Sequence, residues 1–212
     1  NMFILYHPTI QIFFSVLILI GLYRWDRLFK IYAIIFPLFV PIALEISQII
    51  SRDHVSIESI YGGFSFTIIN MQIIAEFEQN NMMIGYAFLV ILFCSNLNAL
   101  GHGRKVDIII GSSYAAFAFL ALFAADFISL FISLELMMIV SSVMIFIGGY
   151  HASLRSAKKY FLTHLISGNM IIIGVAYLYM KTGTTHFVNL SELLASTEYS
   201  PIILAIVLTG LI

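Results

Sequence analysis

The strongest constraint on this chain is a series of apolar runs, each long enough to cross the roughly 30 Å hydrocarbon core of a bilayer as a helix. Helices are the only reasonable form for these runs, because backbone groups exposed to lipid must satisfy their own hydrogen bonds and the runs lack the alternation of a membrane barrel. Six runs are complete and a seventh is unfinished at the end of the sequence: Pro8–Tyr23, Phe29–Ile50, Met82–Leu100, Ile108–Ala125, Phe127–Ile147, Tyr160–Met180 and Pro201–Ile212. The sequence therefore predicts an all-α polytopic membrane protein.

Composition excludes several other classes of protein. Of the 212 residues, 61% are hydrophobic and 10% are charged, whereas a soluble domain carries about a quarter charged residues. Ten Lys and Arg stand against eleven Asp and Glu, so there is no excess of positive charge to attract nucleic acid. Cys94 is the only cysteine, which excludes an intrachain disulfide and a Cys-based zinc or iron-sulfur site. We expect no bound metal and no cofactor.

The basic residues predict the orientation of the helices, because Lys and Arg in short loops stay on the cytoplasmic side. Eight of the ten fall in alternate connections, after the first, third and fifth runs: Arg24, Arg27, Lys30, Arg104, Lys105, Arg155, Lys158 and Lys159. The other connections hold only Arg52 and Lys181. This alternation supports the helix count, and it places the N-terminus outside a multi-pass protein of the inner cell membrane.

Two connections are longer than the rest. Residues 51–81 are acidic, and their part GGFSFTIINMQI alternates weakly, which is compatible with a small hairpin outside the membrane. Residues 182–200 are rich in Ser and Thr and are compatible with a short surface helix. Pro37 and Pro41 should kink the second run, which is tolerated where neighbouring helices satisfy the freed carbonyl groups.

Glu135 is the outstanding polar residue inside a predicted span. It lies eight residues past the outer end of the fifth run, so about 12 Å deep at 1.5 Å per residue. An acid at that depth needs a partner, a wet cavity or a proton, and such acids usually mark ion or proton pathways. The alternative is a neutral glutamic acid that only hydrogen-bonds between helices. Ser142, seven residues later, falls on nearly the same helix face.

Other polar residues in the spans have stronger structural explanations. Lys158 and Lys159 open the sixth run, where lysines at a cytoplasmic helix end normally reach the interface and set topology. Of the two, only Lys159 has a polar neighbour one turn on, Thr163. His164 is the only histidine well inside a span, and with Ser167 and Gly168 it forms a small polar face. It is either a titratable relay or a histidine that packs helices together.

The second half of the sequence resembles the antiporter-like membrane subunits shared by Mrp-type cation/proton antiporters and respiratory complex I. In that family an Asp at an outer helix start is followed nine residues later by a Glu inside the next span, as Asp126 and Glu135 are in DFISLFISLEL. A basic loop follows, then a helix that begins with a Lys-Tyr-Phe-like element, here SAKKYF, and ends in YLYMKTGTTHF. The stretch KYFLTHLISGNMIIIGVAYLYMKTGT is more similar to the Mrp-type large subunits than to most complex I members.

The resemblance implies a function and its residues. Glu135 corresponds to the proton-pathway acid, Lys159 to the lysine that starts the sixth helix, with Lys158 an extra lysine beside it, and His164 is a candidate relay. The implied function is a proton-translocating subunit of a multisubunit membrane complex, with other membrane subunits as partners and protons, and Na⁺ or K⁺, as transported ions. If the chain is of the complex I type, it is part of an NADH-quinone oxidoreductase without carrying the redox chemistry itself.

The resemblance also implies a division of the chain. Residues 1–100 would form the first three transmembrane helices with the long external loop 51–81. Residues 101–212 would form the first part of the proton-translocation domain, with its remaining helices absent from this sequence. Because a complete pathway needs those helices, the alternative interpretation is a membrane scaffold or truncated remnant that transports nothing.

Overall fold

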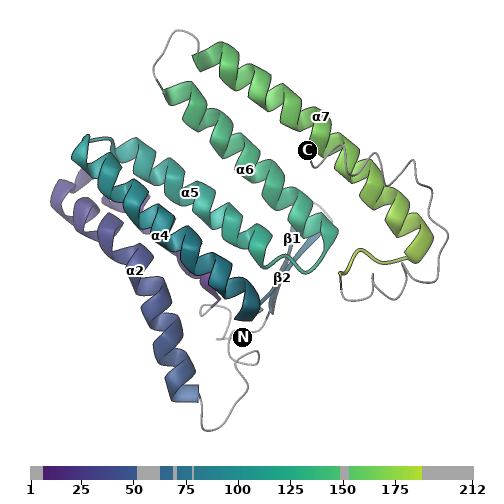
Figure 1. Ribbon diagram of the computed structural model, residues 1–212, viewed down its shortest axis with the longest axis horizontal. Helices are drawn as coiled ribbons and strands as arrows, with labels where there is room; N and C mark the ends of the chain where they lie inside the picture. Colours follow the sequence, from purple (N-terminus) through teal and green to yellow (C-terminus); the bar gives the residue numbers. More distant parts are fainter. Residues whose placement is uncertain (1–6, 52–62, 69–70, 78, 149–152, 188–212) are drawn as a thin grey trace. The chain divides into compact units, whose positions relative to one another are not determined.

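The computed structural model describes residues 7–51, 63–68, 71–77, 79–148 and 153–187. It forms two compact units, residues 1–64 with 76–123 and residues 65–75 with 124–212. A helix forms in each of the six complete apolar runs (Figure 1). The unfinished run at 201–212 lies outside the described residues, as does most of the connection 182–200, where a short surface helix is expected.

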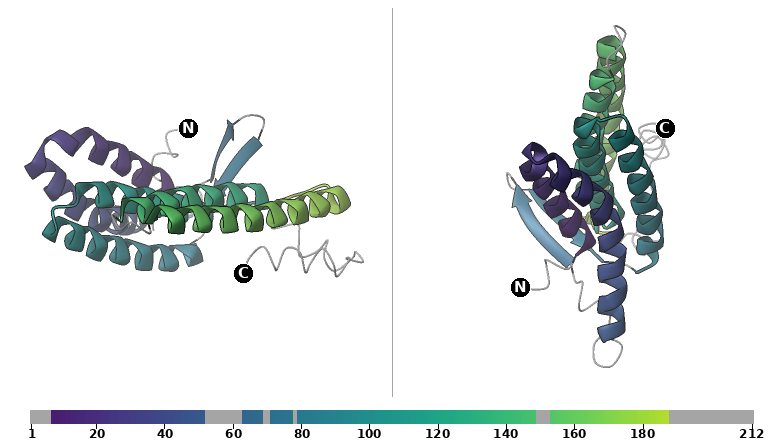
Figure 2. Two further views of the ribbon diagram at one scale, coloured as in Figure 1. Left: turned by 90° about the horizontal axis from the view of Figure 1, so that it is seen from above. Right: turned by 90° about the vertical axis from the view of Figure 1, so that its left-hand side faces the viewer.

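The first unit is built from helices (Figures 1 and 2). They are α1 (Pro8–Gly21), the short 3-10 helix η2 (Leu22–Arg24), α2 (Asp26–Ser51), α4 (Gln79–Gly101) and α5 (Lys105–Leu122). Apolar side chains from all four α-helices form its core: Leu19, Phe29, Ala33, Phe36, Leu92, Ala99, Ile108 and Ala115. Asp26 sits where η2 meets α2, and it pairs with Lys105 and Lys30, each at 2.8 Å. Hydrogen bonds from Lys105 and Lys30 hold the pKa of Asp26 down at about 2.

Helix α2 continues through Pro37 and Pro41. Because proline has no N–H group, Pro37 leaves the carbonyl group of Ala33, four residues earlier, without its helical donor. Asn96 of α4 supplies one, since its buried side-chain amide donates to the Ala33 carbonyl oxygen at 2.9 Å. This is the satisfaction of a freed carbonyl by a neighbouring helix that the sequence predicts.

The second unit contains α6 (Phe127–Ile147) and α7 (Ser153–Thr182), which run side by side in opposite directions (Figures 1 and 2). Most of the two-stranded sheet, β1 (Gly63–Ile68) and β2 (Met71–Glu76), also belongs to this unit. The strands confirm the hairpin that the alternation in the long connection suggests. The described part of the chain is therefore helical apart from this small sheet and its adjoining segments.

The residues before α6 are extended and paired on both sides. Ala124 pairs with Ala75 of β2, and the N–H group of Ala125 donates to the carbonyl oxygen of Ile74 at 3.1 Å. On the other side Asp126 pairs with His186, in the segment that follows α7. This pairing corrects the predicted fourth helix, because the apolar run continues to Ala125 whereas the helix ends at Leu122.

The length and hydropathy of four helices are sufficient to cross a membrane: Asn81–Gly101, Lys105–Leu122, Phe127–Ile147 and Leu154–Lys181. The apolar helix Pro8–Arg24 is shorter, and α2 is 26 residues long. Large apolar side chains also point away from each unit's interior, with Met180 82% and Met83 75% exposed. Exposed apolar surface on this scale is typical of helices whose solvent is lipid.

Candidate functional site on helices α6 and α7

Asp126 fixes the start of α6. It is the N-cap residue, and its side chain accepts a hydrogen bond from the backbone N–H of Ser129 at 3.1 Å and another from the Ser129 hydroxyl group. The Thr185 hydroxyl group, beyond the end of α7, donates to the other carboxylate oxygen at 3.3 Å. Asp126 is only 2% exposed. The acid that the resemblance singles out therefore joins the start of α6 to the segment after α7.

Glu135 lies eight residues past Phe127, the first residue of α6, as the sequence predicts. Its side chain crosses to α7, where one carboxylate oxygen packs directly on Gly168. The ring of Phe131, one turn earlier on α6, lies next to the same glycine. A Cβ atom at position 168 would occupy the space that the carboxylate takes. We call this space beside Gly168 the seat of Glu135.

His164 lies one turn before Gly168 on α7. Its imidazole is close enough to the Glu135 carboxylate for an electrostatic interaction between them. The Tyr160 ring stacks at a tilt on the imidazole, with 4.3 Å between ring centroids. The two predicted site residues that lie deepest in the helices are thus brought together, from helices that are separate in sequence.

The two lysines lie farther along α7 than the sequence predicts. This helix begins at Ser153 and not at Tyr160, so Lys158 and Lys159 lie inside it. The polar neighbour of Lys159, Thr163, donates its hydroxyl hydrogen to the Lys159 carbonyl oxygen at 2.9 Å, so this hydroxyl group serves the helix backbone. Nine residues of helix, about 14 Å, separate Lys159 from Gly168. No salt bridge in the described part of the chain joins Glu135 to either lysine.

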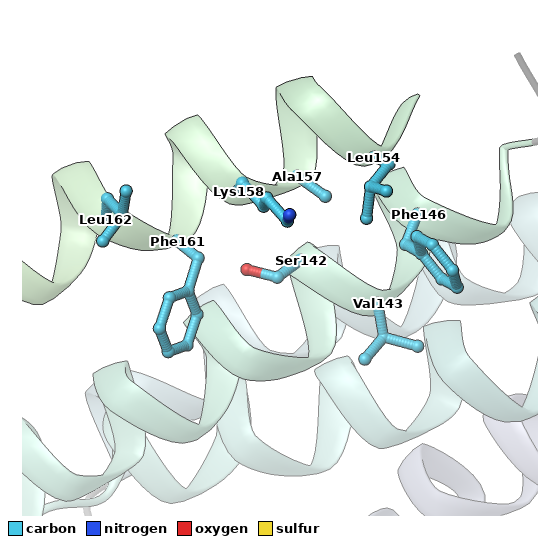
Figure 3. Close-up of a pocket in the computed structure, with 8 residues that line it drawn as sticks. All are labelled: Ser142, Val143, Phe146, Leu154, Ala157, Lys158, Phe161 and Leu162. Atoms are coloured by element: carbon cyan, nitrogen blue, oxygen red, sulfur yellow. The ribbon is translucent and has the colours of Figure 1, made fainter. Parts of the chain in front are cut away.

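Lys158 belongs to a groove that the sequence does not reveal. Its side chain reaches toward Ser142 of α6, which also bonds back to the Met138 carbonyl oxygen at 2.8 Å (Figure 3). Ser142 and Glu135 therefore both face α7, as their spacing predicts. The sequence holds one indication of the groove, the helical spacing of Ala157, Lys158 and Phe161. This spacing places the three residues on the face of α7 that packs on α6.

Among the residues that the structure describes, no three His, Cys, Asp or Glu side chains are close enough to hold a metal ion. Glu135 of α6 and His164 of α7 instead lie within electrostatic range of each other, one on each helix of the pair. Carboxylate and imidazole groups are the side chains that most often carry out acid-base chemistry in proteins.

Comparison with known proteins finds a family match for the second half of the chain. Residues 124–212 match the family described as "NADH:quinone oxidoreductase/Mrp antiporter, TM". The resemblance to the antiporter-like membrane subunits is confirmed. The match begins just before α6 and includes both helices that carry Glu135, His164 and Lys159.

Two curated relatives match part of this chain, and both are named as Na⁺/H⁺ antiporter subunits. The one from Alkalihalophilus pseudofirmus is 31% identical over 83 residues, which are 39% of this chain and 17% of that protein. The one from Bacillus subtilis is 30% identical over 86 residues, which are 41% of this chain and 17% of that protein. The matches thus span about one sixth of each relative.

A solved structure extends the likeness in fold to most of the chain. One chain of the membrane-bound sulfane sulfur reductase, an archaeal respiratory membrane complex, has a TM-score of 0.64 to it at 21% identity. The match covers 87% of this chain and 30% of that chain. Together with the apolar helices, these findings support a multi-pass membrane protein whose second half is similar to the antiporter-like membrane subunits.

Proposed function

We propose that this chain is part of a proton-translocating, antiporter-like subunit of a multisubunit membrane complex. The family match supports this proposal, as do the two relatives named as Na⁺/H⁺ antiporter subunits. Its partners would be the other membrane subunits of that complex, and it would reside in the inner cell membrane. Protons are the transported ion in this proposal, with Na⁺ or K⁺ as the exchanged cation.

The observation that carries the proposal is the position of Glu135. Its carboxylate lies about 12 Å along α6 from the helix start, and it is turned onto the neighbouring helix beside His164. An ionisable pair inside a helix bundle is costly, and such pairs typically line ion or proton pathways. Glu135 would take up and release the proton, and His164 would relay it along α7.

Lys159 would influence Glu135 at a distance. About 14 Å along α7 separates Lys159 from Gly168, where the Glu135 carboxylate packs. The lysine would therefore act through His164, which lies between them on α7. Lys159→Gln should then lower transport more than Lys158→Gln does. The reverse order would transfer this role to Lys158.

The proposed topology has six complete spans and an N-terminus outside. The alternation of basic clusters supports it. In this topology the start of α6 lies on the outer side, so Glu135, eight residues past that start, would be reached from the outer side.

The proposal is tested by two substitutions of Glu135 in the intact complex. Glu135→Gln keeps shape and hydrogen bonding but cannot release a proton, so proton-coupled ion movement should be abolished or strongly reduced. Glu135→Asp keeps the carboxyl group on a side chain one methylene shorter, so part of the activity should remain. Transport is measured in inverted vesicles at matched protein levels. Glu76→Gln, an exposed acid on β2, is the matched control and should transport normally.

A packing role for Glu135 predicts the opposite order. A neutral acid and an amide pack alike, so Gln would be nearly silent, while Asp would leave a small void. A fully active Glu135→Gln variant would end the proton-pathway assignment. It would favour the alternative that this chain is a membrane scaffold and that other subunits of the complex carry out the transport.

A further inference from the structure

The ends of α6 and α7 line an open, apolar groove of about 440 Å³ beside one positive charge (Figure 3). Its walls are Ser142, Val143 and Phe146 from α6 and Leu154, Ala157, Lys158, Phe161 and Leu162 from α7. All of these residues lie within the second unit. Apart from the serine hydroxyl and the lysine ammonium groups, the lining side chains are hydrocarbon, so the groove favours an apolar occupant.

The charge at the groove has no acidic partner nearby in sequence. Residues 136–187 contain no Asp or Glu, whereas Arg155 and Lys159 lie within one turn of Lys158. No salt bridge to Lys158 is present in the described ranges. The first turn of α7, which includes Leu154, also has backbone N–H groups that lack helical acceptors and favour an anion. The last carbonyl groups of α6 lie at the same end and carry the opposite partial charge. The positive charge of this end of the helix pair therefore comes from its basic side chains, Arg155, Lys158 and Lys159.

We propose that this groove binds an anionic phospholipid, with an acyl chain along Val143, Phe146 and Phe161 and the phosphate group near Lys158. An acyl chain matches the hydrocarbon walls, and the phosphate group supplies the negative charge that Lys158 lacks. Basic pockets between transmembrane helices bind anionic headgroups in the same way. A packed helix of another chain would instead cover the lysine and leave its charge without a partner unless it brought an acid. The proposal does not depend on proton translocation.

The test uses the complete complex in lipid nanodiscs that contain a small fraction of phosphatidylglycerol with a diazirine on its acyl chain. After irradiation, lipid adducts are mapped and quantified by peptide mass spectrometry. Adducts on residues 142–162 are compared with adducts on the exposed face of α4 around Met83, which serves as the reference for bulk lipid. Labelling of the groove should exceed the reference, and unlabelled phosphatidylglycerol should compete for it while phosphatidylcholine does not.

Two lysine variants provide a matched pair. Lys158→Gln should reduce groove labelling about fivefold, the effect expected from one basic side chain at an anionic lipid. Lys159→Gln removes the same charge from the next residue, which does not line the groove, and should leave the labelling unchanged. Equal effects of the two variants would indicate only a general attraction of anionic lipid to the basic helix end, and would overturn the site.

A third variant fills the groove. Ala157→Phe should abolish the preferential labelling while the reference labelling on α4 persists. If this variant fails to assemble, the lysine pair alone decides, since both lysines are exposed and their replacement should not affect folding. Groove labelling at or below the reference, or equal competition by phosphatidylcholine, would overturn the proposal and favour a protein segment as the occupant.

Discussion

The carboxylate of Glu135 on α6 packs on Gly168 of α7, at a position where α7 has no side chain. The deepest acid of the helix pair thus depends on a glycine of the neighbouring helix for its position. Because an acid that must exchange protons needs a defined place relative to its partner groups, a change at residue 168 should affect transport even though glycine has no chemistry of its own.

The first prediction concerns this seat. Gly168→Ala places a Cβ atom where the Glu135 carboxylate lies, so the carboxylate must move and transport should fall at least tenfold. Gly111→Ala is the matched control, since a Cβ atom at Gly111 of α5 meets open space, and it should transport normally. Adding Glu135→Asp to Gly168→Ala shortens the acid and should restore part of the activity. A double variant no better than Gly168→Ala would argue against the seat.

The second prediction concerns the proline in α2. Asn96→Leu removes the donor to the Ala33 carbonyl oxygen and leaves that buried acceptor unsatisfied, which should cost about 1–3 kcal/mol of stability. In a Pro37→Ala background the helix regains its own N–H donor, so the same Asn96→Leu change should cost less. Thermal unfolding of the four proteins in detergent gives the coupling between the two residues. Equal costs in both backgrounds would mean that the amide acts elsewhere.

The third prediction concerns the start of α6. Asp126→Ala removes an N-cap and the partner of Thr185, and should destabilise the chain by about 1–2 kcal/mol. Thr185→Val removes only the hydroxyl hydrogen bond and should cost less. The two are compared by thermal unfolding. Equal losses for the two variants would show that the cap interaction with Ser129 contributes little.

The fourth prediction is a pH dependence from His7, which precedes α1. Its ring is buried and packs edge to face on Phe64 and Phe123, and neither ring nitrogen has a hydrogen-bond partner among the described residues. Burial lowers the pKa of His7 to about 4. The unfolded chain therefore binds a proton near pH 6.5 that the folded chain does not, and stability falls as the pH drops from about 6.5 toward 4.

The expected loss from His7 between pH 7.5 and pH 5 is about 2 kcal/mol. His7→Leu cannot titrate, so it should flatten the pH dependence of thermal unfolding over that range. His102→Leu, a change at an exposed loop histidine, should leave it unaltered. An unchanged pH profile for His7→Leu would place the titrating group elsewhere.

The fifth prediction tests the orientation. Cys94 is the only cysteine and is exposed, so it is first replaced by Ser. A cysteine at Asp53 should then react with an impermeant maleimide added outside the cell, whereas one at His102 should react only after the membrane is permeabilised. Reaction of both cysteines from the same side would contradict the proposed topology, in which successive loops lie on opposite sides of the membrane.

Local distances along a helix could be predicted from the sequence, and contacts between helices could not. The depth of Glu135 depends only on the start of α6 and the rise per residue, so it was predictable. Its contact with Gly168 depends on the register between α6 and α7, which packing sets. Likewise, hydropathy locates the apolar part of α7 but not its start, because Arg155 and Lys158 continue the helix beyond the apolar segment.

The end of α5 also depends on contacts that could not be predicted from the sequence. Ala124 and Ala125 are as compatible with a helix as the residues before them, so the sequence predicts that the helix continues. They are extended because β2 and the segment after α7 bond to them. Those partners come from about 50 residues earlier and 60 residues later in the chain, which no local pattern reveals. The effect of Pro37 was predictable because the freed carbonyl follows from covalent structure, although the identity of the donor, Asn96, was not.

The bond between Asp126 and Thr185 also bears on how the protein is made. The two residues are 59 positions apart, so Asp126 leaves the ribosome well before its partner is synthesised. During that interval α6 has the N-cap that Asp126 forms by accepting hydrogen bonds from Ser129, but not the hydrogen bond from Thr185. The hydrogen bond forms only after the whole of α7 has been translated, so the junction between the start of α6 and the segment after α7 is completed last in this helix pair.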